Sequence, residues 1–590
     1  MNRHLKPTTA PADTGLSAVA SAASADLPEA AAGQRTPVAL RSPDEVMRLN
    51  RLGSFHQSRL SFLRALIRRL GDERWQFSRP VWSVDEQGVG VAVYEARGPH
   101  RTYSLIAFAN DLDDAKRSDR VVATEWDACF VLFDGQPTRA DLARLRVQVP
   151  RQEAGRLSRS ELSLARANRS VRLFNQVRQL LAQGQQPSAS QLDETGYLMR
   201  TTAVYGSGKF GALDRRFLAD RPELAAPFQV EMLTVTLIRQ FSFDIVEHLA
   251  RADSPAGAVP LDDHLKRGLG IGNATGLGMA PFLINHPALL NNWVLARETA
   301  LARVRSLPAA TPQAAACFSD ILERARLCAA SWQTDHRDQQ DRVKHYRADL
   351  KRLAQWINNT RPFAGRSPWN TIYEWSRKNL SQEGQEGCVT LLLEPHADLV
   401  DDLVETMGAD ESRDLAVDGT MTIGQLTELI ERHYLRALQT DFEGHEGNAR
   451  FWYVSEEKLE PRLGERRVDA GAERESPLAT NRDAASLYRL CQSRPNGEPV
   501  ASLMLEQPES RHIVRRVQML ERYPYAEIHD NLISASLRPI DMLRCKLSFL
   551  GANRFDPRSD RWVRITLARH APLLHELTGA PDDWIYPARS

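Results

Sequence analysis

Two glycine-rich segments carry the strongest chemical signal in this chain of 590 residues. The first, GLGIGNATGLG at residues 268–278, has five glycines in eleven positions and precedes a long apolar stretch. Glycines let several backbone N–H groups point the same way, and Asn273 and Thr275 add short polar side chains. A helix beginning near Gly278 would add the partial positive charge of its N-terminus. The segment therefore predicts a binding site for an anionic ligand or a developing oxyanion.

The second segment, YGSGKFG at residues 205–211, satisfies GxGxxG in spacing only, because no βαβ unit is expected around it. It is not a P-loop either, since Ala203 and Phe210 stand where that motif needs glycine and Ser or Thr. What remains is Lys209, one of only nine lysines, set among glycines. A lysine there can pair with an anion, act as a base, or form a Schiff base if it is desolvated.

The two segments together define one predicted pocket. Its substrate-binding residues are Gly206, Gly208, Gly270, Gly272, Asn273, Thr275, Gly276 and Gly278. Lys209 is its predicted catalytic residue. Two other interpretations of 268–278 stay open: the glycines allow close packing between elements, or they form a hinge.

His396 is the second predicted catalytic residue. It follows GCVTLLLEP, which reads as a buried strand, and a histidine at a strand end can exchange protons near neutral pH. Asp398 is only a weak suggestion of a metal ligand, so no metal site is predicted. A second acidic and aromatic stretch, YPYAEIHD at 523–530, matches no metal motif and is read as a solvated loop or helix start.

The elements that must position these residues begin after an Ala-, Pro- and Ser-rich stretch, residues 1–40, predicted to be a disordered tail. Residues 41–156 are predicted as an α+β domain. Its first helix is capped by Ser42 and Glu45, and its second, at 58–71, carries Arg64, Arg68 and Arg69 largely off its apolar face. A β-hairpin follows at 89–110, and then a further strand or two before residue 135.

Residues 157–362 are predicted as a helical domain that holds both glycine-rich loops. Helices are expected at 158–184, at 227–250, at 287–306, and over 314–359 as one long helix or a helical hairpin. The first of these should be capped by Ser158 and Glu161. A short seam with spacing 3, 4, 3, 4 favours packing within the chain; its residues are Val343, Tyr346, Leu350, Leu353 and Ile357.

Residues 363–590 are predicted as a mixed α/β region, with helices at 369–380 and near 421–438 and a surface loop at 464–481. The fold class expected for the whole chain is α+β and predominantly helical. It has a small antiparallel sheet near the N-terminus, a central helical region and a mixed C-terminal region.

Composition narrows the function classes. The formal net charge is +1, so no global field attracts nucleic acid or an acidic membrane, and no stretch reaches eighteen uninterrupted apolar residues. The six cysteines show no CxxC pair and fit a reducing cytoplasm. Arginine far outnumbers lysine, which reflects a GC-rich, bacterial type of genome, and the arginines are expected on solvated helix faces.

These observations predict a soluble cytoplasmic metabolic enzyme, of lyase or hydrolase type, acting on a small anionic organic metabolite. The cofactor is unknown, because no nucleotide or metal motif is found. The alternative is a helical scaffold or regulatory protein that binds a protein partner, with nucleic acid a less favoured partner. Homo-oligomers through helical segments remain possible on this reading.

Overall fold

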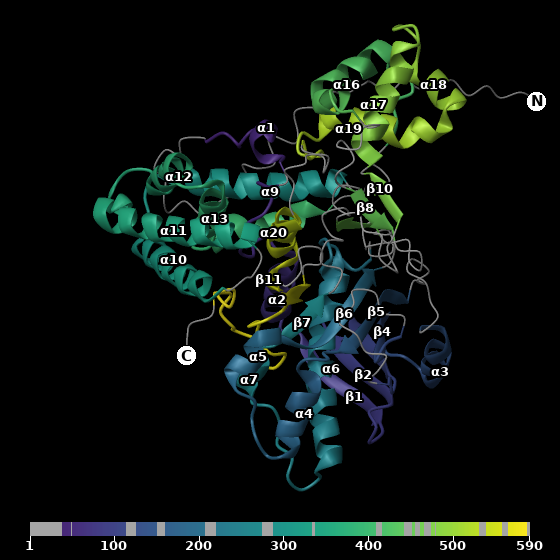
Figure 1. The fold of residues 1–590 in the computed structure, drawn as a ribbon, viewed down its shortest axis with the longest axis vertical. Helices are drawn as coiled ribbons and strands as arrows, with labels where there is room; N and C mark the ends of the chain where they lie inside the picture. Colours follow the sequence, from purple (N-terminus) through teal and green to yellow (C-terminus); the bar gives the residue numbers. More distant parts are fainter. Residues whose placement is uncertain are drawn as a thin grey trace, which may run out of the picture.

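The structure is a computed structural model. It describes residues 38–48, 50–113, 125–149, 160–206, 220–273, 287–332, 337–408, 416–441, 451–454, 461–464, 474–477, 479–529, 539–556 and 564–586. Within these residues the protein is a mixed α/β molecule with many helices and one long sheet. Figure 1 shows the sheet at one end, a group of helices beside it, and a separate helical unit at the opposite end.

The long sheet has nine strands and draws them from both ends of the chain. In spatial order they are β1 (Gln76–Val84), β2 (Gly90–Arg97), β3 (Thr102–Ala109), β4 (Ala128–Asp134), β5 (Glu161–Arg169), β6 (Tyr197–Gly206), β7 (Gly270–Asn273), β12 (Arg564–Leu567) and β11 (Ala552–Asp556). Neighbours pair antiparallel except β6 and β7, which are parallel. The expected small N-terminal antiparallel sheet is therefore wrong in size, in extent and in one pairing.

The predicted hairpin is confirmed as β2 and β3, which pair from Gly90 opposite Ala109 to Arg97 opposite Thr102. The sequence analysis did not predict β1, because Pro80 interrupts its pattern. β1 tolerates the proline because it lies at the edge of the sheet, and its register shifts between Ser78 and Val81.

The helix predicted at 158–184 is wrong in its first half, where the chain forms strand β5. β5 lies between β4 and β6 in the sheet, and Leu162 and Leu164 are buried there. This packing outweighs the local helix propensity. Glu161 does not complete a helix cap, since its carboxylate accepts a hydrogen bond from Arg144 Nη1 at 2.7 Å. Only the second half is helical, as α4 (Phe174–Ala182).

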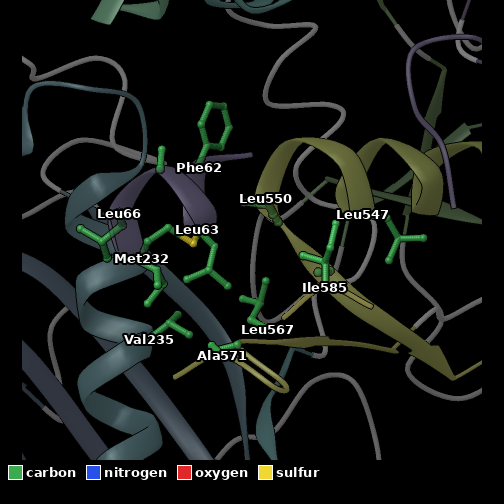
Figure 2. Packing of buried hydrophobic residues seen from close by; sticks show 14 of the residues in the cluster. Phe62, Leu63, Leu66, Met232, Val235, Leu547, Leu550, Leu567, Ala571 and Ile585 are labelled. Carbon is green, nitrogen blue, oxygen red and sulfur yellow. The ribbon is translucent and has the colours of Figure 1, made fainter. Parts of the chain in front are cut away.

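Helix α6 (Gln229–Asp253) covers the sheet and confirms the helix predicted at 227–250. It is apolar on most sides because it lies between the sheet and other helices. Figure 2 shows Met232 and Val235 of α6 near Leu63 of α2 (Phe62–Asp72) and Leu567 of β12. Leu547 of α20 (Pro539–Leu550) lies farther along the same cluster, beside Ile585. Each such side chain contributes about 1.5–3 kcal/mol on burial, so residues far apart in sequence share one core.

Arg239 of α6 ties the C-terminal segment to the sheet. Its buried guanidinium donates hydrogen bonds to five backbone carbonyls, those of Lys266, Arg267, Leu269, Ala571 and Pro572, at 2.8–3.4 Å. Three of these carbonyls lie where α7 (Asp263–Arg267) leads into β7. Arg239 therefore holds the start of β7 and the chain after β12 together.

A group of helices packs beside the sheet. It consists of α9 (Pro287–Arg305), α10 (Pro312–Ser331), α11 (Arg337–Thr360), α12 (Pro368–Asn379), α13 (Gln382–Leu393) and α14 (Ala397–Val400). The region predicted at 314–359 is a helical hairpin, α10 and α11. All five seam residues are buried, which confirms the predicted packing within the chain; they are Val343, Tyr346, Leu350, Leu353 and Ile357.

The strand predicted at GCVTLLL is wrong, because these residues form the second half of α13. Residues 388–393 are almost all fully buried, since α13 lies among α9, α10, α11 and α12. A helix enclosed on every side shows a continuous apolar run and loses the 3.6-residue pattern that would identify it.

A separate hydrophobic core holds the unit at the far end in Figure 1. Its helices are α16 (Ile423–Leu438), α17 (Ala479–Gln492), α18 (Val500–Glu506) and α19 (Arg511–Arg522). A three-stranded sheet is ordered β10 (Arg474–Pro477), β8 (Phe451–Val454) and β9 (Pro461–Gly464). β10 lies inside the predicted surface loop 464–481, so that loop is not continuous.

The remaining elements are short. They are α1 (Pro43–Val46), α3 (Arg139–Gln148), α5 (Ala189–Thr195), and the 3₁₀ turns η5 (Pro222–Leu224), η6 (Pro362–Ala364), η7 (Asp401–Met407) and η8 (Pro508–Ser510). Ser42 does occupy the N-cap position of α1, but its side chain makes no capping hydrogen bond.

Candidate functional site

The structure places part of each glycine-rich segment. Gly206 is the last residue of β6, whereas Gly208 and Lys209 lie outside the described residues. Gly270, Gly272 and Asn273 belong to β7, whereas Thr275, Gly276 and Gly278 lie outside the described residues.

The described glycines of β7 are packed tightly. A Cβ atom on Gly270 would come within 2.1 Å of the backbone oxygen of Leu567, and one on Gly272 would meet the ring of Tyr197 at 2.8 Å. These distances are shorter than side chains tolerate, so glycine is required at both positions for packing. Close packing, one of the open alternatives, therefore accounts for Gly270 and Gly272.

The backbone of β7 is also engaged on both sides. It pairs with β6 on one side and with β12 on the other, and the N–H of Gly270 donates to the carbonyl of Gly196 at 2.9 Å. An anion held by backbone N–H groups of this segment would therefore use residues after Asn273.

The two strands that hold the described ends of the glycine-rich segments, β6 and β7, are neighbours in the sheet and run parallel. Thr201 of β6 lies opposite Asn273 of β7, so both strands run toward the same end of the sheet, and β6 continues five residues past the end of β7, to Gly206. The first turns of α6 lie at this end of the sheet too, since the hydroxyls of Ser163 and Thr234 are 2.6 Å apart and Ser163 lies opposite Gly206. We call this region the β6–β7 edge.

Two buried charged residues that the sequence analysis missed belong to β6 and α6. Arg200 is 3% exposed and lies opposite Gly272, and Glu231, in the first turn of α6, is 4% exposed. Buried charges are costly unless they have partners, and they concentrate at functional sites. The available signal was an arginine inside the apolar run YLMRTTAVY.

His396 lies in the helical group, between α13 and α14, and not at the β6–β7 edge. Its ring meets the ring of Trp369 edge-on, with the two centroids 4.6 Å apart. Burial lowers its pKa to about 4, and the carboxylate of Asp398 only partly opposes this. The prediction that His396 follows a strand and titrates near neutrality is therefore wrong, since its imidazole is neutral at physiological pH.

The arginines of α2 do not lie on a solvated face, contrary to prediction. Arg64 is fully buried and forms hydrogen bonds of 2.7 and 2.9 Å with Glu394 and of 2.9 Å with Asp582. Arg68 joins Asp582 at 2.9 Å. Arg59 and Asp401 complete a balanced cluster of three cations and three carboxylates, in which Arg59 binds Asp401 through two hydrogen bonds of 2.7 Å. The cluster has a structural role, because it joins α2 to α13 and to the C-terminal segment.

A second buried ion cluster centres on Arg41. Its guanidinium donates to Glu298 at 2.8 and 2.9 Å and to Glu386 at 3.0 Å, and all three side chains are buried. Arg297 also donates to Glu298, at 3.0 Å. This cluster fixes the segment before α1 on α9 and α13. The carboxylate of Glu527, in the stretch read as solvated, is also buried, and it accepts hydrogen bonds from Tyr434 and Arg516.

A polar segment between α1 and α2 is the feature that sequence reasoning missed most completely. Residues Ser54–Ser61, SFHQSRLS, form neither helix nor strand, yet every one of them is buried. We call it the buried polar segment. Irregular chain usually lies at the surface, because its polar groups need water. Its last four residues, 58–61, fall within the helix predicted at 58–71.

Within the described residues, no group of three or more His, Cys, Asp or Glu side chains is arranged to hold a metal ion. None of the helices described is long and apolar enough to cross a membrane. No protein-family model, no curated protein and no solved structure matches this chain.

Proposed function

We propose that the protein is an enzyme that acts on a small anionic organic metabolite at the β6–β7 edge. The observation that supports this most is the parallel pairing of β6 and β7, the two strands that hold the described ends of the glycine-rich segments. In sheets with parallel strands, ligands bind beyond the carboxyl ends of neighbouring strands, where loops from both can surround them.

In this proposal the backbone N–H groups after Asn273 hold the anion, and Lys209 neutralises its charge or acts as the base. The N-terminus of α6, a helix of 25 residues, adds favourable potential at the same edge. Arg200 of β6, opposite Gly272, is a further cation in the same part of the sheet. A lyase or hydrolase reaction suits such a site, because it needs positioned charges and a proton acceptor. His396 takes no part in it.

The alternative of a scaffold for protein partners loses one of its supports. The seam on α11, which a partner helix would need to contact, packs against the chain's own helices. This removes one argument for the alternative, and the enzyme remains our proposal.

A thermal-shift panel of organic acids and inorganic phosphate tests the proposal. A ligand present at about 100 times its dissociation constant stabilises the folded protein by about 2.7 kcal/mol. The stabilisation by the best ligand should disappear in Lys209→Ala and in Gly276→Val. Lys351→Ala is the matched control, because Lys351 is an exposed lysine on α11.

The control should keep the full ligand-induced shift. If all three variants respond to every ligand as the unmodified protein does, the β6–β7 edge is not the anion site and the proposal fails.

A further inference from the structure

The net charge of +1 for the whole chain conceals a strongly basic stretch that spans α11 and α12. Residues 342–378 contain nine arginines and lysines but only two acids, Asp349 and Glu374. Both acids are engaged. Asp349 is 4% exposed and accepts a hydrogen bond from the Ser381 N–H at 3.0 Å, and Glu374 accepts one from Arg305 at 3.1 Å. The positive charge of this stretch is therefore local, and the rest of the chain has a net negative charge.

Two stacked tryptophans lie within the basic stretch. Trp356 is near the end of α11 and Trp375 is in the second half of α12, and their ring centroids are 4.6 Å apart with 13° between the ring planes. Both pack against the main core but remain partly exposed. The stack places α11 and α12 side by side, and in Figure 1 both helices lie on the side of the helical group away from the sheet.

Cations flank the stacked pair on both sides along the two helices. Arg352 is four residues before Trp356, and Lys378 is three residues after Trp375. Residues at these spacings lie one helical turn apart on the same side of a helix. On the other side of the stack, the connection between the helices carries two further arginines. We call these residues the basic tryptophan surface; they are Arg352, Trp356, Arg361, Arg366, Trp375 and Lys378.

The four cations of this surface are all exposed. Among the described residues, no carboxylate pairs with Arg361, Arg366 or Lys378. Arg352 lies 3.7 Å from Asp349, but its side chain is 54% exposed. Four exposed cations on one surface favour a ligand that carries several negative charges. Lys351 is not part of this surface, because it lies about 140° around α11 from Trp356.

The tryptophans distinguish between the classes of polyanion. Nucleic acid uses both features, since its phosphates contact cations and its bases stack on aromatic side chains. An acidic membrane would also bury exposed aliphatic side chains. In the described part of the chain, none of the strongly exposed large hydrophobic side chains lies on α11 or α12. An acidic polypeptide would use the cations alone. The bases of a duplex already stack on one another, so a single strand fits the tryptophans better.

We propose that the basic tryptophan surface binds single-stranded nucleic acid, with its four cations on phosphates and its tryptophan pair on a base. None of the residues assigned to the β6–β7 edge belongs to this surface. The inference therefore does not depend on the proposed enzyme, and either one can fail without the other.

Fluorescence anisotropy of a labelled oligo-dT, measured with the full chain at several salt concentrations, tests the proposal. Four phosphate contacts predict a slope of about −3 for the logarithm of the binding constant against the logarithm of the salt concentration. Raising the salt from about 50 to about 200 mM should therefore weaken binding by about 50-fold. An oligo-U of the same length should bind about as tightly, because stacking tolerates any base.

Removing two cations tests the phosphate contacts. The double variant Arg352→Gln, Lys378→Gln should bind oligo-dT about tenfold or more weakly at low salt, with about half the salt slope. The matched control is Arg146→Gln, Arg251→Gln, which removes the same charge from exposed residues of α3 and α6. The control should keep the affinity and the slope of the unmodified protein.

Replacing one tryptophan tests the contact with a base. Trp375→Leu should weaken binding by about tenfold and leave the salt slope unchanged, whereas Trp375→Phe, which keeps an aromatic ring, should recover most of the affinity. The cation variants alter exposed side chains only, so they test the proposal even if Trp375→Leu fails to fold.

Four outcomes would overturn the proposal. The first is oligo-dT binding that the double cation variant does not weaken, and the second is an equal loss in the control. The third is a dA–dT duplex that binds as tightly as oligo-dT at the same salt concentration. The fourth is binding to phosphatidylserine vesicles or to polyglutamate, or to neither, in the absence of binding to oligo-dT.

Discussion

Replacing Asp582 with Asn tests the buried ion cluster of α2. The substitution keeps the shape of the side chain but removes its charge, and it leaves three arginines facing two carboxylates. Asp582 accepts hydrogen bonds of 2.9 Å from both Arg64 and Arg68. Burial by itself raises the pKa of Asp582, but the two arginines outweigh burial and lower the pKa to about 2.

The difference between this pKa and the ordinary value of 3.8 gives the magnitude. It corresponds to roughly 2 kcal/mol of stabilisation at pH 7. Because the folded pKa is below the unfolded one, the stabilisation is complete well above pH 4 and is lost as the pH falls toward 2. At pH 3 about half of it remains. Asp582→Asn should therefore destabilise the folded protein by roughly 2 kcal/mol at pH 7 and by about half as much at pH 3.

Amide exchange of the peptide that covers α2, read by mass spectrometry, measures this local stability. A loss of roughly 2 kcal/mol corresponds to about 30-fold faster exchange. Asp402→Asn is the control, because Asp402 pairs with Arg303 at 2.8 Å but its side chain is 58% exposed. Equal exchange in the two variants at pH 7, or an effect of Asp582→Asn that does not shrink at pH 3, would refute the reasoning.

Four further outcomes are expected. Gly272→Val should lower the melting temperature through a clash worth about 1–3 kcal/mol, and shortening Tyr197 to Leu should recover part of the loss. Arg239→Met should cost about 1–3 kcal/mol or more, seen as faster amide exchange near residue 269, because buried carbonyls lose their donor. The pKa of His56 is lower in the folded protein than in the unfolded chain, so between pH 7 and pH 4.5 only the unfolded chain gains a proton and the folded protein loses stability. In His56→Leu this loss of stability should be smaller by roughly 2–3 kcal/mol, as measured by urea titrations at both pH values. Leu350→Ala should destabilise by about 2–5 kcal/mol while the elution volume in size-exclusion chromatography stays constant, since the seam packs within the chain.

Local patterns predicted three elements. The hairpin of β2 and β3 was indicated by the turn between its strands, and the seam on α11 by the spacing of its apolar residues. Helix α6 was indicated by an apolar run too long for a strand. The patterns failed where burial is uniform. Residues 388–393 form a helix enclosed on all sides, and β5 is a central strand, so neither shows its own periodicity.

The candidate site was predictable only in part for a similar reason. The parallel pairing of β6 and β7, the strands that hold the described ends of 205–211 and 268–278, is a property of the sheet that sequence spacing does not reveal. Arg64 was expected in solvent because its carboxylate partners, Glu394 and Asp582, are 330 and 518 residues away along the chain. The buried polar segment was missed because composition alone assigns polar, irregular chain to the surface.

The position of β12 beside β7 has a consequence for synthesis on the ribosome. β7 ends at Asn273 and its partner strand begins at Arg564, so one edge of β7 has no partner while about 290 further residues are made. At about 5–20 residues per second this takes roughly 15–60 seconds. An unpaired strand edge can join the edge of another nascent chain. During that interval the short β7, with glycine at two of its four positions, offers little surface to such a partner, and the sheet closes only when the last part of the chain emerges.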